Sequence, residues 1–279
     1  MRNNQIDPYL YPDTPVLRNK LGIKDSELLA AAEVDMACKA IHSITMFPIE
    51  GNYDFSHYCE FHKRIFGEIY DWAGEPRTVL IEKHEAALGY MSIEYASPNN
   101  IKSEAEAILQ KMKTENWEAL NSDSLATAVS KYMASLWKVH PFRDGNTRTT
   151  ITFICQYFES IGIHMDKVLF EQNAGYMRTA LVAASAVYND IDLSKTEYLL
   201  KIVDDSIKRG MSVHKDNPPP TQALTQVCPH PKPLSQKNID DKPSVLEAIR
   251  GNDEQLKVVY SPKKSKESRK AKSKHNDER

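Results

Sequence analysis

The segment from residue 140 to 148, His-Pro-Phe-Arg-Asp-Gly-Asn-Thr-Arg, gathers within nine residues the groups that chemistry at a phosphate requires. His140 is its only side chain that can take up a proton near neutral pH, so it is the candidate general base. Asp144 is the candidate magnesium ligand, because a carboxylate beside a polyphosphate needs a cation between them. These two residues indicate phosphoryl or nucleotidyl transfer.

The second half of the segment predicts an anion site at the start of a helix. Gly145 permits a tight turn, and Asn146 and Thr147 begin an apolar helical pattern whose first N–H groups lack partners within the helix. Arg148 adds a permanently charged donor fork suited to phosphate. We group Phe142 with these substrate-binding residues, although its simplest role is to anchor the loop in the core.

Each feature has a plainer interpretation when taken alone. A histidine before a proline, such as His140 before Pro141, is usually a helix-end residue. Asp-Gly-Asn by itself is more often a simple turn than a metal site. The order of the whole string is what favours a catalytic site.

The elements that must position this segment are mostly helices, as shown by apolar residues at three- and four-residue spacing. We expect helices at about 25–41, 54–69, 101–117, 123–139, 146–161, 171–188 and 194–209. Between residues 77 and 95 the pattern becomes strand-like, which predicts a hairpin-like flap. The expected fold is therefore all-α, with one short β-hairpin flap on a helical body.

The composition of the chain changes near residue 210. Residues 1–210 carry the apolar periodicity of a folded domain, whereas residues 211–279 are proline-rich and then basic, with little to bury. We expect a disordered tail, and the alternative is a basic arm that contacts an acidic partner or nucleic acid. The net charge of −2 gives the whole molecule no general attraction to nucleic acid or membrane.

The sequence predicts a cytoplasmic protein with no membrane partner. No stretch approaches the roughly 18 apolar residues of a membrane span, and the N-terminus lacks the apolar run of a signal peptide. The four cysteines lie far apart and form no CxxC pair. Delivery as a secreted effector, by a route that needs no leader, is the alternative that the sequence leaves open.

The segment resembles the signature of the Fic family, H-x-F-x-[DE]-G-N-x-R. The matching positions are His140, Phe142, Asp144, Gly145, Asn146 and Arg148. The similarity extends over about residues 7–205, including residues 51–55 and 62–77. The resemblance implies a mainly helical Fic domain with an N-terminal helical extension over residues 1–210.

The resemblance also implies a protein adenylyltransferase, which moves AMP from ATP to a Tyr, Ser or Thr hydroxyl of a target protein. His140 would deprotonate the hydroxyl, Asp144 would hold Mg²⁺, and Arg148 would bind the β- or γ-phosphate. Backbone N–H groups of residues 145–147 would form the anion hole, with the side chain of Asn146 helping.

Two further groups of residues receive roles from the resemblance. The flap would clamp an extended segment of the target by strand addition. Its docking residues would be Thr78, Val79, Leu80, Ile81, Glu82 and Lys83. Asn173 and Tyr176, on a later helix, would line the adenine pocket, and their alternative roles are a helix cap and a core aromatic.

Two motif positions depart from the usual G-N-G-R-x-x-R pattern. Thr147 replaces a glycine, which is tolerable because the backbone N–H groups do the binding. Ile151 replaces the second arginine and removes a γ-phosphate contact. The alternatives to ATP-dependent adenylylation are therefore another nucleotide or donor, with phosphate or phosphocholine transfer, and a catalytically silent binding module.

The inhibitory helix of many family members, [ST]-x-x-x-E-[GN], is incomplete here. Glu50-Gly51 resembles its end, but Met46 stands where Ser or Thr belongs. The arginine that such a glutamate would bind is replaced by Ile151. We therefore predict no internal glutamate lock at Glu50. Either a separate small antitoxin protein restrains the enzyme, or the enzyme is intrinsically weak.

Overall fold

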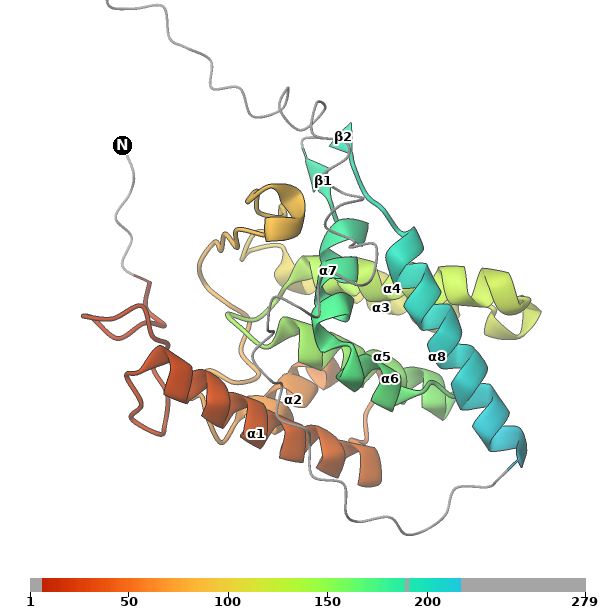
Figure 1. Cartoon of the computed structure of the whole chain (residues 1–279), viewed down its shortest axis with the longest axis horizontal. Coiled ribbons are helices and arrows are strands. Elements are labelled where there is room, and N and C mark those ends of the chain that lie inside the picture. The colour runs from red at the N-terminus through yellow and green to blue at the C-terminus, as the bar shows by residue number, and fades with distance from the viewer. Residues whose placement is uncertain (1–6, 189–190, 217–279) are drawn as a thin grey trace, which may run out of the picture.

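The computed structural model describes residues 7–188 and 191–216 of the 279-residue chain. Figure 1 shows a mainly helical body in this part of the chain, which confirms the predicted fold class. The helices are α1 (Ser26–Met46), α2 (Phe55–Phe66), α3 (Ile101–Thr114), α4 (Ser122–Val139), α5 (Asn146–Ser160), α6 (Lys167–Gln172), α7 (Ala174–Ala184) and α8 (Glu197–Asp216). The short elements are the 3-10 turns η1 (Ala86–Leu88) and η2 (Trp117–Ala119) and the antiparallel strands β1 (Val187–Tyr188) and β2 (Ile191–Asp192).

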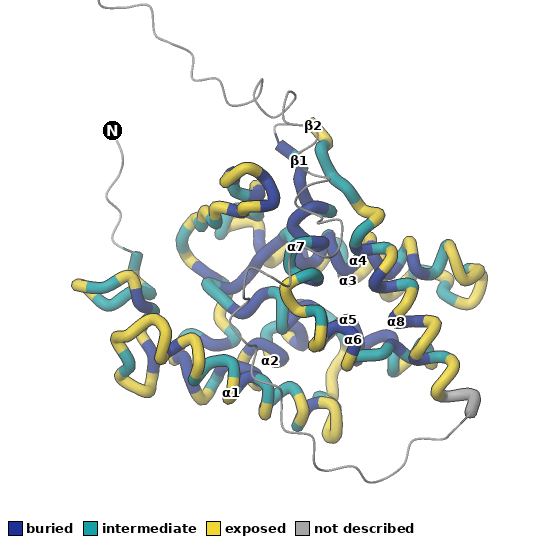
Figure 2. Tube along the Cα trace, viewed as in Figure 1, coloured by how far each residue is buried: buried dark blue, intermediate teal, exposed yellow. Residues whose placement is uncertain are grey.

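Helix α4 lies at the centre of the fold and packs against α3, α5, α7 and α8. Its buried stripe has three- and four-residue spacing and includes Val129, Met133, Leu136 and Trp137. Figure 2 shows that buried stretches gather where the helices meet, whereas the outer face of α1 is largely exposed. Because α4 and α5 share this core, the loop between them is held firmly at both ends.

Helix α2 forms a second wall of the core and packs against α1, α3 and α5. Asp54 caps it, because its carboxylate accepts a hydrogen bond from the His57 N–H at 2.9 Å. The helix ends at Phe66, a few residues before the predicted end at 69. Gly74 adopts a left-handed φ of 88° in a later turn.

The predicted helix at 171–188 is interrupted. Asn173, with φ −118° and ψ 32°, separates α6 from α7, and α7 ends at Ala184 before β1 begins. The Asn173 amide donates to the Leu169 carbonyl at 2.8 Å. Asparagine favours such breaks because its side chain competes with the backbone for hydrogen bonds.

The flap, residues 77–95, folds back on itself as predicted, but it pairs at a single antiparallel bridge between Glu85 and Met91. The turn is made by η1 and by Gly89, which has a left-handed φ of 61°. The strand-like pattern of residues 77–95 therefore does not produce a regular strand pair, because the bridge is not extended into a ladder. The strand pair that the structure describes lies at β1 and β2 instead.

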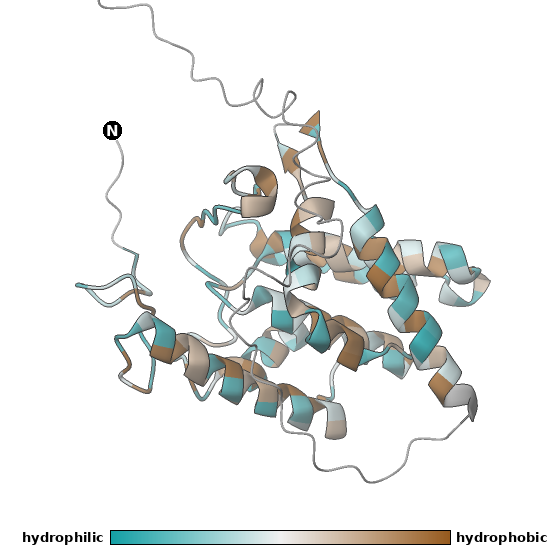
Figure 3. Cartoon of the chain, in the orientation of Figure 1, coloured by the Kyte–Doolittle hydropathy of each residue, from teal (hydrophilic) through white to brown (hydrophobic). Residues whose placement is uncertain are grey.

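Helix α8 closes the domain by packing against α4, α6 and α7. Figure 3 shows hydrophobic and hydrophilic residues alternating along it, and Leu199 and Val203 are fully buried. The helix continues to Asp216, past the expected boundary at residue 210, and the rest of the tail lies outside the described residues. None of the described helices has the length and apolar character that crossing a membrane requires.

Candidate active site

The motif loop, residues 140–145, joins α4 to α5. His140 ends α4 in the left-handed region, with φ 50° and ψ 59°. Arg77, at the start of the flap, holds this turn from outside: its Nε donates to the His140 carbonyl at 2.9 Å, and its backbone N–H donates to the Pro141 carbonyl at 2.7 Å. The hydrogen bonds from Arg77 therefore hold the candidate base through backbone carbonyls, and they do not use its imidazole ring.

The His140 imidazole is 1 % exposed and has no hydrogen-bond partner for either ring nitrogen within the described part of the chain. Its ring lies 4.1 Å from that of Tyr95 and meets the Trp137 ring edge-on at 5.2 Å, centroid to centroid. Burying a polar group without a hydrogen-bond partner costs about 1–3 kcal/mol of folding stability. Such groups therefore need an explanation, and a catalytic role is one of them.

The electrostatic surroundings keep this imidazole neutral. Burial is the main cause, and the cations of Lys83, Arg77 and Arg178 add to it, so the pKa of His140 lies well below the usual 6.5. A neutral imidazole is the form that accepts a proton. His140 is therefore available as a proton acceptor at neutral pH, and its role as the general base stays a prediction.

The Asp144 carboxylate lies beside the helix start and remains 41 % exposed. Its Oδ1 accepts the Gly145 N–H at 2.6 Å and lies 3.8 Å from the Lys83 ammonium. Packing around the carboxyl acts to raise its pKa, but Lys83, the Gly145 N–H and nearby arginines outweigh this, and the net pKa is lowered. The group is thus ionised and already attracts a cation.

Gly145 caps α5 with φ 78°, a conformation that favours glycine. A Cβ there would meet the Phe66 ring at 2.4 Å, so the position has no room for another residue. The backbone N–H groups of residues 146–148 have no acceptor in the described chain, and the first intrahelical bond runs from Thr149 to the Gly145 carbonyl. Of the predicted donors at 145–147, the N–H groups of 146 and 147 are therefore open, whereas the Gly145 N–H is engaged by Asp144, and anion binding at this helix start stays a prediction.

The Asn146 side chain has a different task from the one expected. Its amide oxygen accepts the Phe142 N–H at 2.9 Å, and its amide nitrogen donates to the Phe142 carbonyl at 2.8 Å. With both ends of the amide engaged, Asn146 closes the loop, and help from its second amide N–H at the anion site stays a prediction. Thr147 is also fixed, because its hydroxyl accepts a hydrogen bond from Trp137 Nε1 at 2.9 Å.

Phe142 is fully buried and anchors the loop, which supports the simpler of its two expected roles. Its ring stacks on His62 of α2 at 3.8 Å. His62 Nδ1 accepts the Gly74 N–H at 2.9 Å, so Nε2 carries the proton and donates to the Asp144 carbonyl at 3.0 Å. This supporting role could not be predicted from the sequence, because His62 occurs within an ordinary apolar stripe.

Arg148 lies on the first turn of α5, as predicted, with its guanidinium 4.6 Å from the centre of the Phe66 ring. It also donates to the carboxylate of Glu33 on α1, a residue that the sequence did not single out. Ile151, the replacement for the second arginine, is partly buried and packs against the core. Arg148 is thus the only cationic side chain on α5.

The predicted docking residues of the flap form an extended segment whose exposure alternates. Thr78, Leu80 and Glu82 are exposed, and the residues between them are partly buried. The backbone groups of residues 80–82 make no hydrogen bond within the described chain, which leaves an open edge. Lys83 points inward to Asp144.

Asn173 and Tyr176 use their polar atoms to join helices. Asn173 donates to Leu169, and the Tyr176 hydroxyl donates to the Tyr198 carbonyl of α8 at 3.0 Å. These contacts fit their structural roles, and lining an adenine pocket remains a prediction for both.

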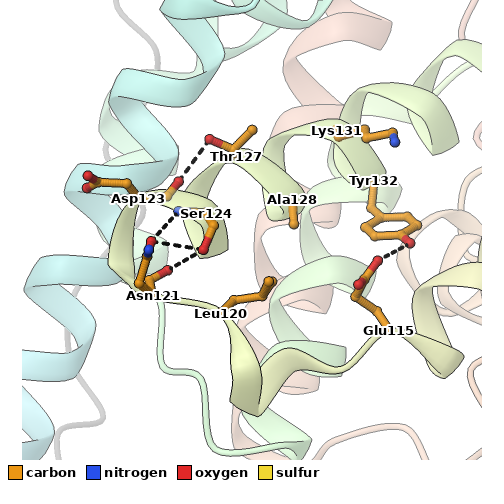
Figure 4. Close-up of a pocket in the computed structure, with 9 residues that line it drawn as sticks. All are labelled: Glu115, Leu120, Asn121, Asp123, Ser124, Thr127, Ala128, Lys131 and Tyr132. Atoms are coloured by element: carbon orange, nitrogen blue, oxygen red, sulfur yellow. Dashed lines mark hydrogen bonds between the residues drawn. The ribbon is translucent and has the colours of Figure 1, made fainter.

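A hollow of about 540 Å³ lies away from the motif loop, between η2 and the start of α4 (Figure 4). Inside it the Tyr132 hydroxyl donates to the Glu115 carboxylate at 2.8 Å, and Asn121 caps α4 through the Ser124 N–H. These side chains are engaged with one another, so this hollow is not the candidate active site.

The site combines three features: a neutral histidine, an ionised aspartate, and an open helix start that carries an arginine. This combination is typical of helical proteins that carry out transfer chemistry at phosphate. A model of the Fic/DOC family matches residues 52–158. The chain is 31 % identical over 166 residues to a probable protein adenylyltransferase, y4lH, of Sinorhizobium fredii, across 59 % of this chain and 82 % of that one. The chain belongs to the Fic/DOC family.

Other relatives agree with this assignment. The chain is 35 % identical over 161 residues to the protein adenylyltransferase VbhT of Bartonella schoenbuchensis, but it spans only 32 % of that protein's length. The N-terminal Fic domain of a Bartonella effector protein from Bartonella sp. AR 15-3 has a TM-score of 0.62 at 21 % identity, covering 76 % of this chain and 96 % of that one. BepC of Bartonella tribocorum, solved with bound AMPPNP, has a TM-score of 0.59 at 23 % identity, covering 71 % and 95 %.

Proposed function

We propose that this chain is a protein adenylyltransferase that transfers AMP from ATP to a side-chain hydroxyl of a target protein. The observation that carries the proposal is the His140 imidazole, which is neutral, buried and without a hydrogen-bond partner beside an open helix N-terminus. The relatives named as adenylyltransferases support AMP as the transferred group.

In the proposed reaction, His140 takes the proton of the target hydroxyl as its oxygen attacks the α-phosphorus of ATP. The new oxygen–phosphorus bond replaces the bond to the β-phosphate, and pyrophosphate leaves. The N–H groups of residues 146–148 and the guanidinium of Arg148 bind the phosphate oxygens. These groups are fixed before the substrate arrives, so little reorganisation is needed during the reaction.

We further propose that Asp144 holds Mg²⁺ together with the ATP phosphates. The described residues contain no cluster of three or more His, Cys, Asp or Glu that could hold a metal by themselves. A single ionised carboxylate nevertheless fits magnesium, which takes many of its ligands from phosphate and water. When bound, the ion would neutralise phosphate charge, and Lys83 is the protein cation nearest to this position.

The flap is proposed to hold the target by strand addition along its open edge at residues 80–82. Alternating exposure gives that edge an outer row of side chains for selectivity. In the same structure the His140 ring is covered by Tyr95. The target hydroxyl therefore reaches the base only after this part of the flap moves.

Other predictions from the sequence stay predictions: restraint by a separate antitoxin, a contact between the tail and an acidic partner or nucleic acid, and a cytoplasmic or effector location. The tail beyond residue 216 lies outside the described residues.

Transfer of label separates the proposed donor chemistry from its alternatives. The protein is incubated with a host lysate and with ATP labelled on either the α- or the γ-phosphate. Incorporation of α-label alone into protein is the expected result. Incorporation of γ-label would instead indicate phosphate transfer, and the absence of both would argue against transfer from ATP.

A further inference from the structure

We propose that Glu33 and Tyr70, which lie outside the motif, form a positioning pair that orients the Arg148 guanidinium toward the β- and γ-phosphates. The inference rests on the proposed function and extends its binding site to α1 and to the turn after α2. Neither residue is expected to touch the reacting atoms, so both act through Arg148.

The contacts form a chain of three side chains. Arg148 Nη2 donates to one oxygen of the Glu33 carboxylate, and the other oxygen accepts the Tyr70 hydroxyl. The Glu33 side chain is only 14 % exposed, and Tyr70 is fully buried. A charge-assisted hydrogen bond of this kind is about twice as strong as a neutral one, so it holds the arginine in one geometry.

Aromatic rings hold both ends of this chain. The Tyr70 ring stacks on Trp72 at 4.4 Å with an interplanar angle of 20°. The Arg148 guanidinium lies over the Phe66 ring, and the same ring closes against Gly145 at the helix start. The guanidinium is thus fixed from below by a ring and from one side by a carboxylate.

The remaining donors of Arg148 stay available. A guanidinium has five N–H donors, and Glu33 engages only the Nη2 end. The Arg148 side chain is 31 % exposed, so its other edge can face a ligand. Ordering such a long side chain costs rotamer entropy, and here that cost is met before ATP binds.

A competing interpretation is that Glu33 blocks Arg148 and so opposes ATP. The geometry favours a positioning role for Glu33, because Tyr70 holds its carboxylate in place and the other end of the Arg148 guanidinium stays open. Ile151 makes this support more important, because α5 has no second cationic side chain to share the phosphate charge.

The test measures nucleotide binding by the full chain with Mg²⁺, using titration calorimetry with AMPPNP and, separately, with AMP. The variants are Glu33→Gln and Tyr70→Phe. Glu27→Gln is the matched control, because Glu27 is an exposed glutamate on the same helix. Unfolding temperatures establish that each variant is folded. If Glu33→Gln does not fold, Tyr70→Phe still tests the proposal.

We expect Glu33→Gln to weaken AMPPNP binding about 10-fold, because it removes the charge that holds Arg148, and Tyr70→Phe to weaken it about 3-fold, because it removes only the hydroxyl that holds Glu33. AMP binding should change less than 2-fold, because AMP lacks the phosphates that Arg148 faces. A general structural defect would weaken both ligands alike. The control should match the wild type.

Unchanged or tighter AMPPNP binding by both variants would overturn the positioning role, and tighter binding would identify Glu33 as a block. Equal losses for AMPPNP and AMP would also overturn it. Failure of the wild-type chain to bind AMPPNP would be a different result, because it would contradict the proposed function itself.

Discussion

His140 combines a rare backbone conformation with an unpartnered ring. Outside glycine, left-handed angles cost roughly 1 kcal/mol and persist only where the surroundings enforce them. Arg77 enforces them here, since it bonds the carbonyls of His140, of Val79 in the flap and of Ala96 directly after the flap. One buried arginine thus links the motif turn to both ends of the flap.

The lowered pKa of His140 makes a prediction about pH. A base must be neutral to act, and the pKa of His140 in the free enzyme lies well below 6.5. We therefore expect kcat/KM for protein adenylylation to be nearly constant from pH 6.5 to 8 and to fall only at more acid pH. A rise in kcat/KM with a midpoint at or above pH 6.5 would show that the surroundings do not depress this pKa.

Gly145 is expected to tolerate no side chain. Gly145→Ala places a Cβ 2.4 Å from the Phe66 ring at a φ of 78°, so both contact and conformation oppose it. We expect a loss of at least about 2 kcal/mol in the free energy of unfolding, measured with urea, together with lost transfer activity.

Gly175→Ala is the matched control for that substitution. Gly175 lies on α7, and its added Cβ would meet nothing within 4 Å. We expect an unchanged or slightly higher free energy of unfolding, by up to about 1 kcal/mol, because alanine favours the helix. Equal losses in the two variants would refute the close-packing account of Gly145.

At the residue scale, the sequence predicted the groups that lie next to one another in the chain. His140, Asp144 and Arg148 lie around the loop and helix start, where the motif indicated they would be. It could not predict Glu33 or His62, because each meets the motif across a long sequence separation and neither belongs to a distinctive local pattern. Such partners are chosen by packing, which local spacing does not report.

At the element scale, an ion pair ties the flap to α7. Glu85 at the flap bridge accepts a hydrogen bond from Arg178 of α7 at 2.6 Å, and its side chain is only 10 % exposed. The same flap carries Tyr95 over His140 and Lys83 beside Asp144. We therefore expect motion of this element to govern access to His140.

Breaking the ion pair should loosen the flap while the helices stay intact. For Arg178→Ala we expect amide hydrogen exchange over residues 83–91 to accelerate about 10-fold, because a buried carboxylate loses its partner. Arg209→Ala is the control, since it removes an equally charged residue from an exposed pair with Asp205 on α8. Unchanged exchange in Arg178→Ala, or equal acceleration in both variants, would contradict this role of the pair.

The sequence predicted the elements with strong apolar periodicity and failed where tertiary partners decide. Helices α4 and α5 agree closely with their expected ranges of 123–139 and 146–161. The expected helix at 171–188 breaks at Asn173, whose side chain bonds the preceding turn. The flap has strand-like residues but gains only one bridge, because β-propensity needs a neighbouring strand to form a ladder.

At the scale of the whole molecule, acid should destabilise the fold through His62. Burial lowers its pKa to about 3, against 6.5 in the unfolded chain. A lowered histidine pKa gives stability that is complete above pH 6.5 and is lost progressively as the pH falls toward 3. Between pH 6.5 and 4 the loss is on the order of 3 kcal/mol.

Urea unfolding at several pH values measures this dependence. His62→Gln keeps a donor and an acceptor but cannot be protonated, so its unfolding free energy should vary less with pH although it is lower at pH 7. An identical pH dependence in the variant and the wild type would show that another group controls acid unfolding.

The central claim is that His140 serves as the base for transfer of AMP to protein. Incorporation of label from α-labelled ATP into protein is compared for the wild type, His140→Ala and His42→Ala, the last being an exposed histidine on α1. We predict that His140→Ala lowers the rate about 10²- to 10⁴-fold while its unfolding temperature and AMPPNP binding are retained, and that His42→Ala behaves as the wild type. A His140→Ala variant that is folded, binds AMPPNP and still transfers label at the wild-type rate would contradict the account.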